Sequence, residues 1–105
     1  MKAYTSLEQS QKLARILPLE SADMFWPNAP ITVPCIKDGN PMGVNIPCWS
    51  LAALLTTLSF PNLFENDGWN LYTTIDEKLF SINNADNPVD VCVDMVIKLH
   101  EQKLL

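Results

Sequence analysis

The chain has few of the residues that mark common catalytic and cofactor-binding motifs. Its 105 residues include three glycines and one histidine. Gly39 and Gly43 follow Lys37, and no Gly-Lys-Ser/Thr segment comes after them, which excludes a phosphate-binding loop of that kind. The single histidine, His100, has no second imidazole to complete a metal site. The sequence therefore predicts neither a metal nor a cofactor.

Cysteine is also sparse, and its pattern excludes a disulfide framework. The three cysteines, Cys35, Cys48 and Cys92, are odd in number, widely spaced and set among apolar neighbours. A disulfide framework needs an even number of cysteines, and a zinc site needs cysteines that lie close together in the sequence. We therefore expect three reduced, buried thiols that act as small hydrophobic side chains.

The chain also has few basic residues and no long apolar run. Seven basic against twelve acidic residues give a net charge of −5, without the basic stripe that a nucleic-acid partner would need. The longest apolar run, Leu51–Leu55, is far shorter than the ~20 residues that span a bilayer. Met1–Lys12 is mostly polar and lacks the apolar segment of a secretory signal. These features predict a cytoplasmic protein with no nucleic-acid or membrane partner.

What the chain does contain suits one folded domain. Hydrophobic residues make up 48% and charged residues 18%, which is too apolar for a disordered chain. A chain of this length forms one ordinary domain, so we assign residues 1–105 to a single globular unit. Mixed helical and strand periodicity places it in the α+β class.

The first expected helix covers Ser6 to Leu17. Thr5 and Glu8 have the spacing of a capping box, in which the hydroxyl and the carboxylate satisfy free backbone N–H groups. Pro18 disfavours helical geometry at Leu17 and ends the helix.

Two further helices are expected. Pro47–Leu58 is the most apolar segment and has no charged residue, so its helix, from Cys48 or Trp49 to Leu58 or Ser59, is predicted to be the enclosed core of the fold. The last helix should run from Pro88 to about Lys103, with Asn87 as its N-cap. On its wet face we expect Asp90 and Asp94 in solvent, with Asp94 paired to Lys98.

Two hairpins are expected to form a small antiparallel sheet. Trp69 to Ile75 alternates with period two, and Leu79 to Ile82 returns as its partner. Because no glycine lies in that reversal, a longer loop is favoured over a two-residue turn. Ile31–Lys37 and Val44–Pro47 should form the second hairpin. The predicted architecture is two to three helices packed on this sheet.

Three segments carry a resemblance to a family. They are Leu19–Trp26, Pro47–Leu55, and Asn87–Met95 continuing to Leu99–Glu101. In this order and at this length, the chain resembles a family of short uncharacterised proteins encoded by gut bacteria and their prophages or other mobile elements. The resemblance implies a small intracellular accessory protein and carries over no catalytic residue.

The favoured function is therefore protein–protein interaction. Phe25, Trp26, Pro27 and Pro30 lie in the irregular, proline-rich segment from Met24 to Pro34, where burial is hardest to achieve. Aromatic anchors carry much of the energy of protein interfaces. We expect this surface to bind another protein or a second copy, and replacement of Trp26 by Ala to weaken binding without unfolding the domain.

A small cysteine-dependent hydrolase using Cys48 and His100 is the alternative function. A Cys-Trp pair that opens a helix is similar to the nucleophile segment of papain-like proteases, and the helix dipole there favours a thiolate. However, no glutamine or Gly-Ser precedes Cys48, and His100 lies late in a helix. A buried thiol beside a core tryptophan is the favoured interpretation.

Overall fold

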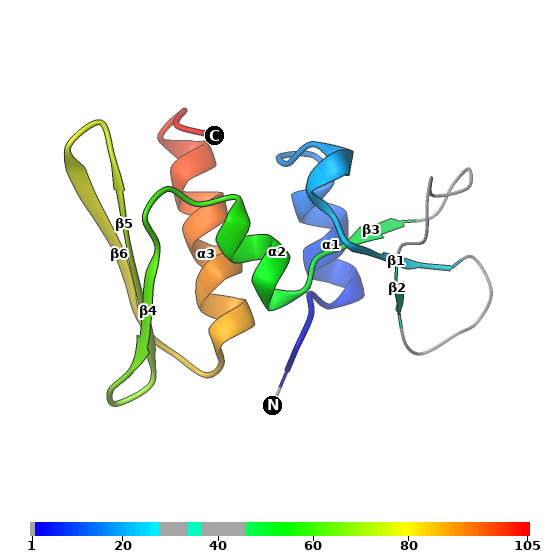
Figure 1. Cartoon of the computed structure of the whole chain (residues 1–105), viewed down its shortest axis with the longest axis horizontal. Helices are drawn as coiled ribbons and strands as arrows, with labels where there is room; N and C mark the ends of the chain where they lie inside the picture. The colour runs from blue at the N-terminus through cyan, green and yellow to red at the C-terminus, as the bar shows by residue number, and fades with distance from the viewer. Residues whose placement is uncertain (1, 28–33, 37–45) are drawn as a thin grey trace.

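Three α-helices and two three-stranded antiparallel sheets form in the computed structural model, which describes residues 2–27, 34–36 and 46–105 (Figure 1). The elements in chain order are α1 (Leu7–Leu13), the 3-10 turn η1 (Leu19–Ser21), β1 (Met24–Trp26), β2 (Cys35–Ile36), β3 (Ile46–Cys48), α2 (Leu51–Thr56), β4 (Asn62–Glu65), β5 (Trp69–Ile75), β6 (Lys78–Ala85) and α3 (Pro88–Glu101). The predicted α+β class is confirmed. The strands make two sheets rather than one.

The molecule is elongated and measures 40 × 28 × 20 Å, and the elements are arranged side by side along its long axis. The sheet β4-β5-β6 lies at one end with α3 against it, α2 and α1 come next, and the sheet β2-β1-β3 lies at the other end (Figure 1). A single cluster of buried side chains joins α1, α2, α3 and β5. The helices are therefore held between the sheets by one continuous core.

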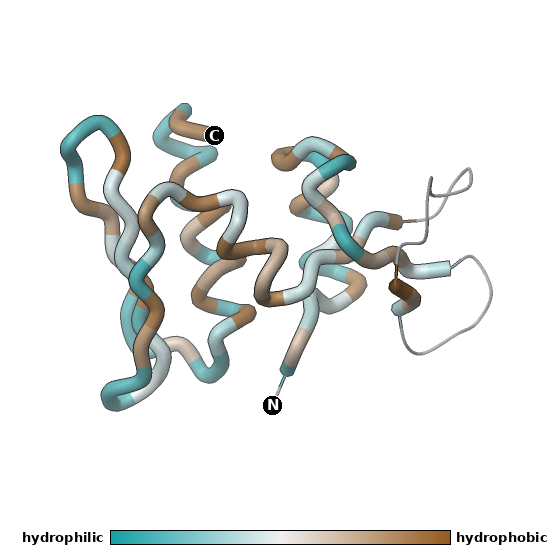
Figure 2. Tube along the Cα trace, in the orientation of Figure 1, coloured by the Kyte–Doolittle hydropathy of each residue, from teal (hydrophilic) through white to brown (hydrophobic). Residues whose placement is uncertain are grey.

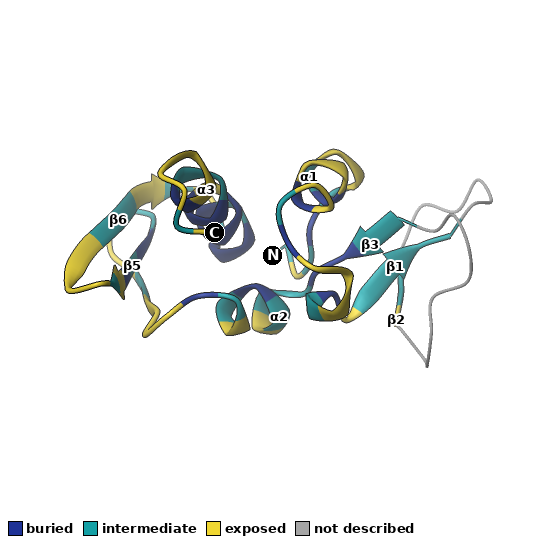
Figure 3. Cartoon of the chain, turned by 90° about the horizontal axis from the view of Figure 1, so that it is seen from above, coloured by how far each residue is buried: buried dark blue, intermediate teal, exposed yellow. Residues whose placement is uncertain are grey.

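The most enclosed helix is α3. Asn87 caps it, because its side chain accepts a hydrogen bond of 2.9 Å from the backbone N–H of Asp90, and Pro88 occupies the first turn. The predicted start is therefore confirmed. Its apolar residues are buried on more than one side, since α3 contacts α1, α2 and the β4-β5-β6 sheet (Figure 3).

The prediction that the middle helix is the enclosed core is wrong. The helix α2 is short and begins at Leu51, with Ser50 as its N-cap. Leu54 is buried, whereas Ala52 and Thr56 are exposed. Ala52 and Thr56 are four residues apart and share the surface face of α2, whereas Leu54, two residues from each, lies on the opposite face and packs on the core.

The first helix begins one residue later than predicted, at Leu7 instead of Ser6. Ser6 and Gln9, rather than Thr5 and Glu8, form the capping box. Thr5 is instead fully buried, where its hydroxyl accepts a hydrogen bond of 3.1 Å from the backbone N–H of Trp49. The helix also ends early, at Leu13, and irregular turns lead on to Pro18.

The hairpin of β5 and β6 is confirmed, but its turn is not the predicted one. Ile75 pairs with Lys78, so Asp76 and Glu77 alone make the reversal, with φ values of 52° and 64°. Positive φ at both positions is the primed geometry that suits the twist of a hairpin. The turn is hydrophilic throughout (Figure 2). The third strand, β4, was not predicted.

The second predicted hairpin is wrong among the described residues. Both β2 and β3 pair with β1, which lies between them, so they are not neighbours. Ile36 on β2 is 78% exposed, so its side chain adds nothing to the core. Val44 and the whole loop between the two predicted strands, residues 38–43, lie outside the described residues. The prolines do not interrupt the middle strand, because β1 ends before Pro27.

All three cysteines are free thiols. Cys48 and Cys92 are buried as predicted, while Cys35 on β2 is only partly buried. Burial of the first two among apolar neighbours suits their role as small hydrophobic side chains.

The charged face of α3 differs from the prediction at Asp90 and at Lys98. Asp90 was expected in solvent, but it is half-buried and accepts hydrogen bonds from Lys2, Gln9 and Asn87. The Lys98 ammonium donates a hydrogen bond of 3.1 Å to the backbone carbonyl of Ser81, instead of pairing with Asp94. Lys98 therefore ties α3 to β6.

Candidate functional site

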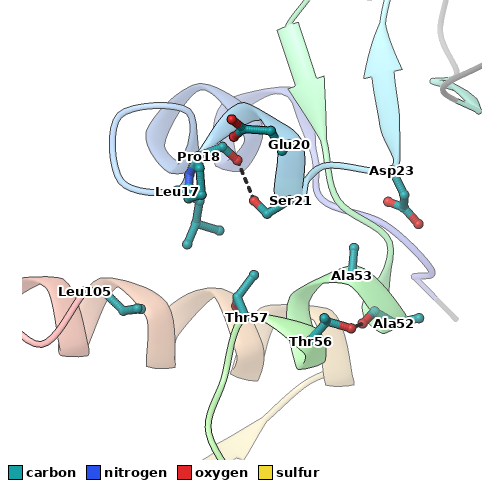
Figure 4. Close-up of a pocket in the computed structure, with 10 residues that line it drawn as sticks. All are labelled: Leu17, Pro18, Glu20, Ser21, Asp23, Ala52, Ala53, Thr56, Thr57 and Leu105. Atoms are coloured by element: carbon teal, nitrogen blue, oxygen red, sulfur yellow. Dashed lines mark hydrogen bonds between the residues drawn. The ribbon is translucent and has the colours of Figure 1, made fainter. Parts of the chain in front are cut away.

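A groove lies between η1 and α2, and most of the surface that lines it is apolar (Figure 4). Its volume is about 630 Å³, within the range of sites that hold small molecules or a few side chains of a partner. Its lining combines small, apolar and acidic residues: Leu17, Pro18, Glu20, Ser21, Asp23, Ala52, Ala53, Thr56, Thr57 and Leu105.

The wall formed by η1 is held by its own hydrogen bonds. Pro18 precedes the turn with extended backbone, and its carbonyl accepts a hydrogen bond of 2.6 Å from the Ser21 hydroxyl. The same hydroxyl accepts a hydrogen bond of 2.9 Å from the indole N–H of Trp49. Since Trp49 is fully buried, it fixes η1 to the core.

The opposite wall is the exposed face of α2. Ala52 and Ala53 have short side chains, which leave the space that larger residues would fill. Thr56 and Thr57 donate their hydroxyls to backbone carbonyls of Ala52 and Leu54 in the same helix, at 2.9 and 2.6 Å. These hydroxyls are satisfied locally, so the wall offers shape rather than hydrogen-bond donors to an occupant.

Two carboxylates give the groove its charge. Asp23 accepts hydrogen bonds from the backbone N–H and the hydroxyl of Ser50, which fixes its position beside the start of α2. Glu20 is exposed. The described lining residues include no lysine, arginine or histidine, so the groove is acidic as well as apolar.

The groove holds no pair of groups equipped for covalent chemistry. Its one serine, Ser21, has its hydroxyl engaged with the Pro18 carbonyl and the Trp49 indole N–H, and neither of these groups is a general base. Its described lining includes no cysteine. The lining therefore offers shape, apolar surface and negative charge to an occupant.

The predicted nucleophile, Cys48, lies elsewhere and is inaccessible. It ends β3 rather than opening a helix, since α2 begins only after the cap at Ser50. Its thiol is fully buried, donates to the carbonyl of Thr5 at 3.5 Å, and lies 3.4 Å from the Thr5 hydroxyl. Burial raises the pKa of Cys48 and outweighs the hydrogen bonds from Thr5 and Ser10 that act to lower it. The thiol is therefore protonated at neutral pH.

The predicted base, His100, lies in a different neighbourhood. It is exposed in the last turn of α3, as predicted, with Nδ1 3.1 Å from the backbone oxygen of Leu105. It borders a hollow of about 350 Å³ together with Lys12, Arg15, Ile16 and Ile97. Neither the hydrogen bonds of His100 nor the residues around that hollow include Cys48. The geometry gives the hydrolase alternative no support.

Part of the predicted aromatic surface makes contacts within the fold instead of facing solvent. Trp26 is half-buried: its indole N–H donates a hydrogen bond of 3.1 Å to the Ser10 hydroxyl, and its ring meets Tyr4 edge-on at 6.1 Å. Phe25 and Pro27 are also half-buried, and Pro30 lies outside the described residues. Trp26 therefore has a structural role that the sequence did not indicate.

The sequence missed the groove because its walls come from segments about 30 residues apart in the chain. One local signal was present. Ala52 and Ala53 stand out as positions where a neighbour can approach α2 closely.

In the part of the chain that the structure describes, no three His, Cys, Asp or Glu side chains gather where they could hold a metal ion. No helix among the described residues has the length and apolar character to cross a bilayer.

Comparison with known proteins gives no match to a family model, a curated protein or a solved structure. The resemblance to short proteins of gut bacteria and the cytoplasmic location thus stay predictions.

Proposed function

We propose that this protein is a non-enzymatic binding protein that docks a segment of a partner protein in the groove between η1 and α2. The observation that carries the proposal is the lining of that groove, which is apolar and acidic and has no catalytic pair. The occupant we propose is a short apolar segment that carries a lysine or arginine.

Size and apolar character support an occupant of this kind. A hollow of about 630 Å³ accommodates several side chains. Leu17, Pro18 and Leu105 offer apolar surface, and each Å² removed from water contributes roughly 25 cal/mol to binding. The small residues of α2 let the backbone of the occupant approach closely.

Charge supports a basic occupant. Glu20 and Asp23 both border the groove, and the described lining has no cation to neutralise them. A lysine or arginine of the partner would gain attraction from both carboxylates, whereas an acidic segment would be repelled by them and by the net charge of −5.

Selection from a random-peptide display library tests the proposal. The immobilised protein should enrich apolar peptides that contain lysine or arginine, and synthetic copies should then be titrated by calorimetry. Ala52→Arg fills the groove and places a cation beside its carboxylates, and arginine is well tolerated in helices. We expect this variant to weaken peptide binding by roughly tenfold or more.

Ala14→Arg is the matched control, since Ala14 is an exposed alanine at the end of α1 and outside the groove lining. It should bind the peptides as the parent does. Glu20→Gln should weaken binding and reduce its salt dependence. Peptides that lack basic residues, or that bind Ala52→Arg as tightly as the parent, would contradict the proposal.

A further inference from the structure

The sheet β4-β5-β6 has one covered and one uncovered face. Leu63, Leu71 and Ile82 are paired across the strands and pack into the core on the side of α3. Side chains alternate between the two faces of a strand, so the residues between them point away from the helices. In Figures 1 and 3, the helices lie on one side of this sheet and the other side is open.

The uncovered face is uncharged and partly aromatic. It carries Asn62, Phe64, Tyr72, Thr74, Leu79 and Ser81. The rings of Phe64 and Tyr72 lie in contact, with centroids 5.4 Å apart, and Leu79 is 68% exposed opposite Thr74. Asn70 lies on the same face but is buried, and its side-chain amide donates to the carbonyls of Asn66 and Gly68.

The absence of charge on this face is informative in a chain of net charge −5. Two copies related by a two-fold axis bring the same patch of each copy together. Any charged residue on the patch would then lie close to a residue of the same charge on the other copy. An uncharged face avoids that repulsion. Depletion of charge together with enrichment in Tyr and Phe is also the composition of interface centres.

We propose that two copies of this chain associate through the uncovered face of the β4-β5-β6 sheet. Two twisted sheets that pack face to face keep their strands nearly aligned and interdigitate side chains from both layers. Phe64, Tyr72 and Leu79 of each copy would fill that layer. The acidic turn residues Asp76 and Glu77 lie at the end of the β5–β6 hairpin, where they would remain in solvent.

A residue with a strained backbone lies beside this face, which also favours an interface there. Phe60 has a positive φ of 49°, which is costly for a residue with a side chain, and it is 86% exposed. The preceding residue, Ser59, is anchored to β5, because its carbonyl accepts hydrogen bonds from the Thr73 hydroxyl and the Thr74 N–H. The fold thus holds a strained aromatic residue in solvent beside the proposed interface.

The proposal is tested by sedimentation equilibrium and light scattering of the full chain, from about 1 µM to about 500 µM. We expect a concentration-dependent dimer. Leu79→Lys and Thr74→Lys each place a like charge within the symmetric face, and each should raise the dissociation constant by roughly tenfold or more. Both positions are exposed, so the fold should be retained, with circular dichroism as the check.

Leu7→Lys is the matched control, because Leu7 is an exposed leucine on α1, away from this sheet. It should leave the dimer unchanged. A chain that stays monomeric across the range, or a dimer that persists in both lysine variants, would overturn the proposal. Peptide docking is separable from dimerisation: Ala52→Arg should leave the dimer intact, and Leu79→Lys should leave peptide binding intact.

Discussion

The indole N–H of Trp26 donates a hydrogen bond of 3.1 Å to the hydroxyl of Ser10, which ties β1 to α1. Ser10 is fully buried and also shares a hydrogen bond of 2.8 Å with the Thr5 hydroxyl. Thr5 in turn accepts from the N–H of Trp49. A chain of buried polar groups therefore links the N-terminal segment to β1 and to the start of α2. Fully satisfied networks of this kind rigidify a fold.

Replacement of Trp26 should therefore destabilise the protein. We expect Trp26→Ala to lower the free energy of unfolding by about 2 kcal/mol, because a half-buried ring and its contact with Tyr4 are lost. Trp26→Phe retains a ring but no N–H, and should cost about 1 kcal/mol. Urea denaturation measures both values. An Ala variant as stable as the parent would contradict this structural role and would favour the sequence prediction, in which Trp26 serves binding and not folding.

A second network fastens the N-terminal segment to α3. One carboxylate oxygen of Asp90 accepts hydrogen bonds of 2.8 Å from Lys2 and from Gln9, and the other accepts from Asn87. Burial acts to raise the pKa of Asp90, but these hydrogen bonds and the charge of Lys2 outweigh it, so the pKa lies below its usual value. The ionised carboxylate is thus favoured in the folded state.

Stability should therefore depend on pH through Asp90. A carboxyl whose pKa is lowered by folding stabilises the fold above its unfolded pKa, and this contribution disappears as the pH falls through the folded value. Asp90→Asn should lower the free energy of unfolding at pH 7 by about 1 kcal/mol, and the difference should shrink below about pH 4. Chemical denaturation across pH 3–7 would measure it, with those limits set by the usual Asp pKa of ~4.

Asp94→Asn is the matched control on the same helix. Burial and the neighbouring charge of Asp90 raise the pKa of Asp94, against a smaller opposing effect of Lys12. Its ionised form therefore opposes folding at neutral pH, and the Asn variant should be at least as stable as the parent at pH 7. Equal losses of stability in both variants would contradict the assigned role of Asp90.

The Asp76-Glu77 turn offers a stabilising substitution. Glu77 has a φ of 64°, which costs a residue with a side chain about 1–2 kcal/mol, whereas glycine adopts it freely. After the entropy cost of glycine, we expect Glu77→Gly to raise the free energy of unfolding by about 0.5–1 kcal/mol. Thermal unfolding measures the gain. Glu101→Gly removes the same charge from the last turn of α3 and should instead destabilise by a similar amount.

Sequence reasoning succeeded where local chemistry decides the structure. Asn87 and Pro88 start α3 by capping alone, and the period-two pattern from Trp69 to Ile75 is enough to define β5. It failed where distant segments compete. Thr5 has the local spacing of a helix cap, but the backbone N–H of Trp49 takes its hydroxyl, so Ser6 becomes the cap.

The sheet β2-β1-β3 and the groove were missed for the same reason. Met24–Trp26 carries no strand alternation long enough to recognise, and its pairing is set by partners ten or more residues away. The groove requires Leu17 and Ala53 to face one another, which follows from how η1 packs on Trp49. Neither relationship leaves a periodic pattern in the sequence.

The cysteines provide a direct test of the hydrolase alternative. Burial raises the pKa of Cys92 to about 12 and also raises that of Cys48, so neither forms a thiolate at neutral pH. Iodoacetamide should therefore modify the partly buried Cys35 first in the folded protein, and all three thiols in denaturant. Mass spectrometry of digested samples over time gives the rate at each site. Rapid modification of Cys48 in the folded state would mean that its thiol is accessible and ionised, and would return this residue to consideration as a nucleophile.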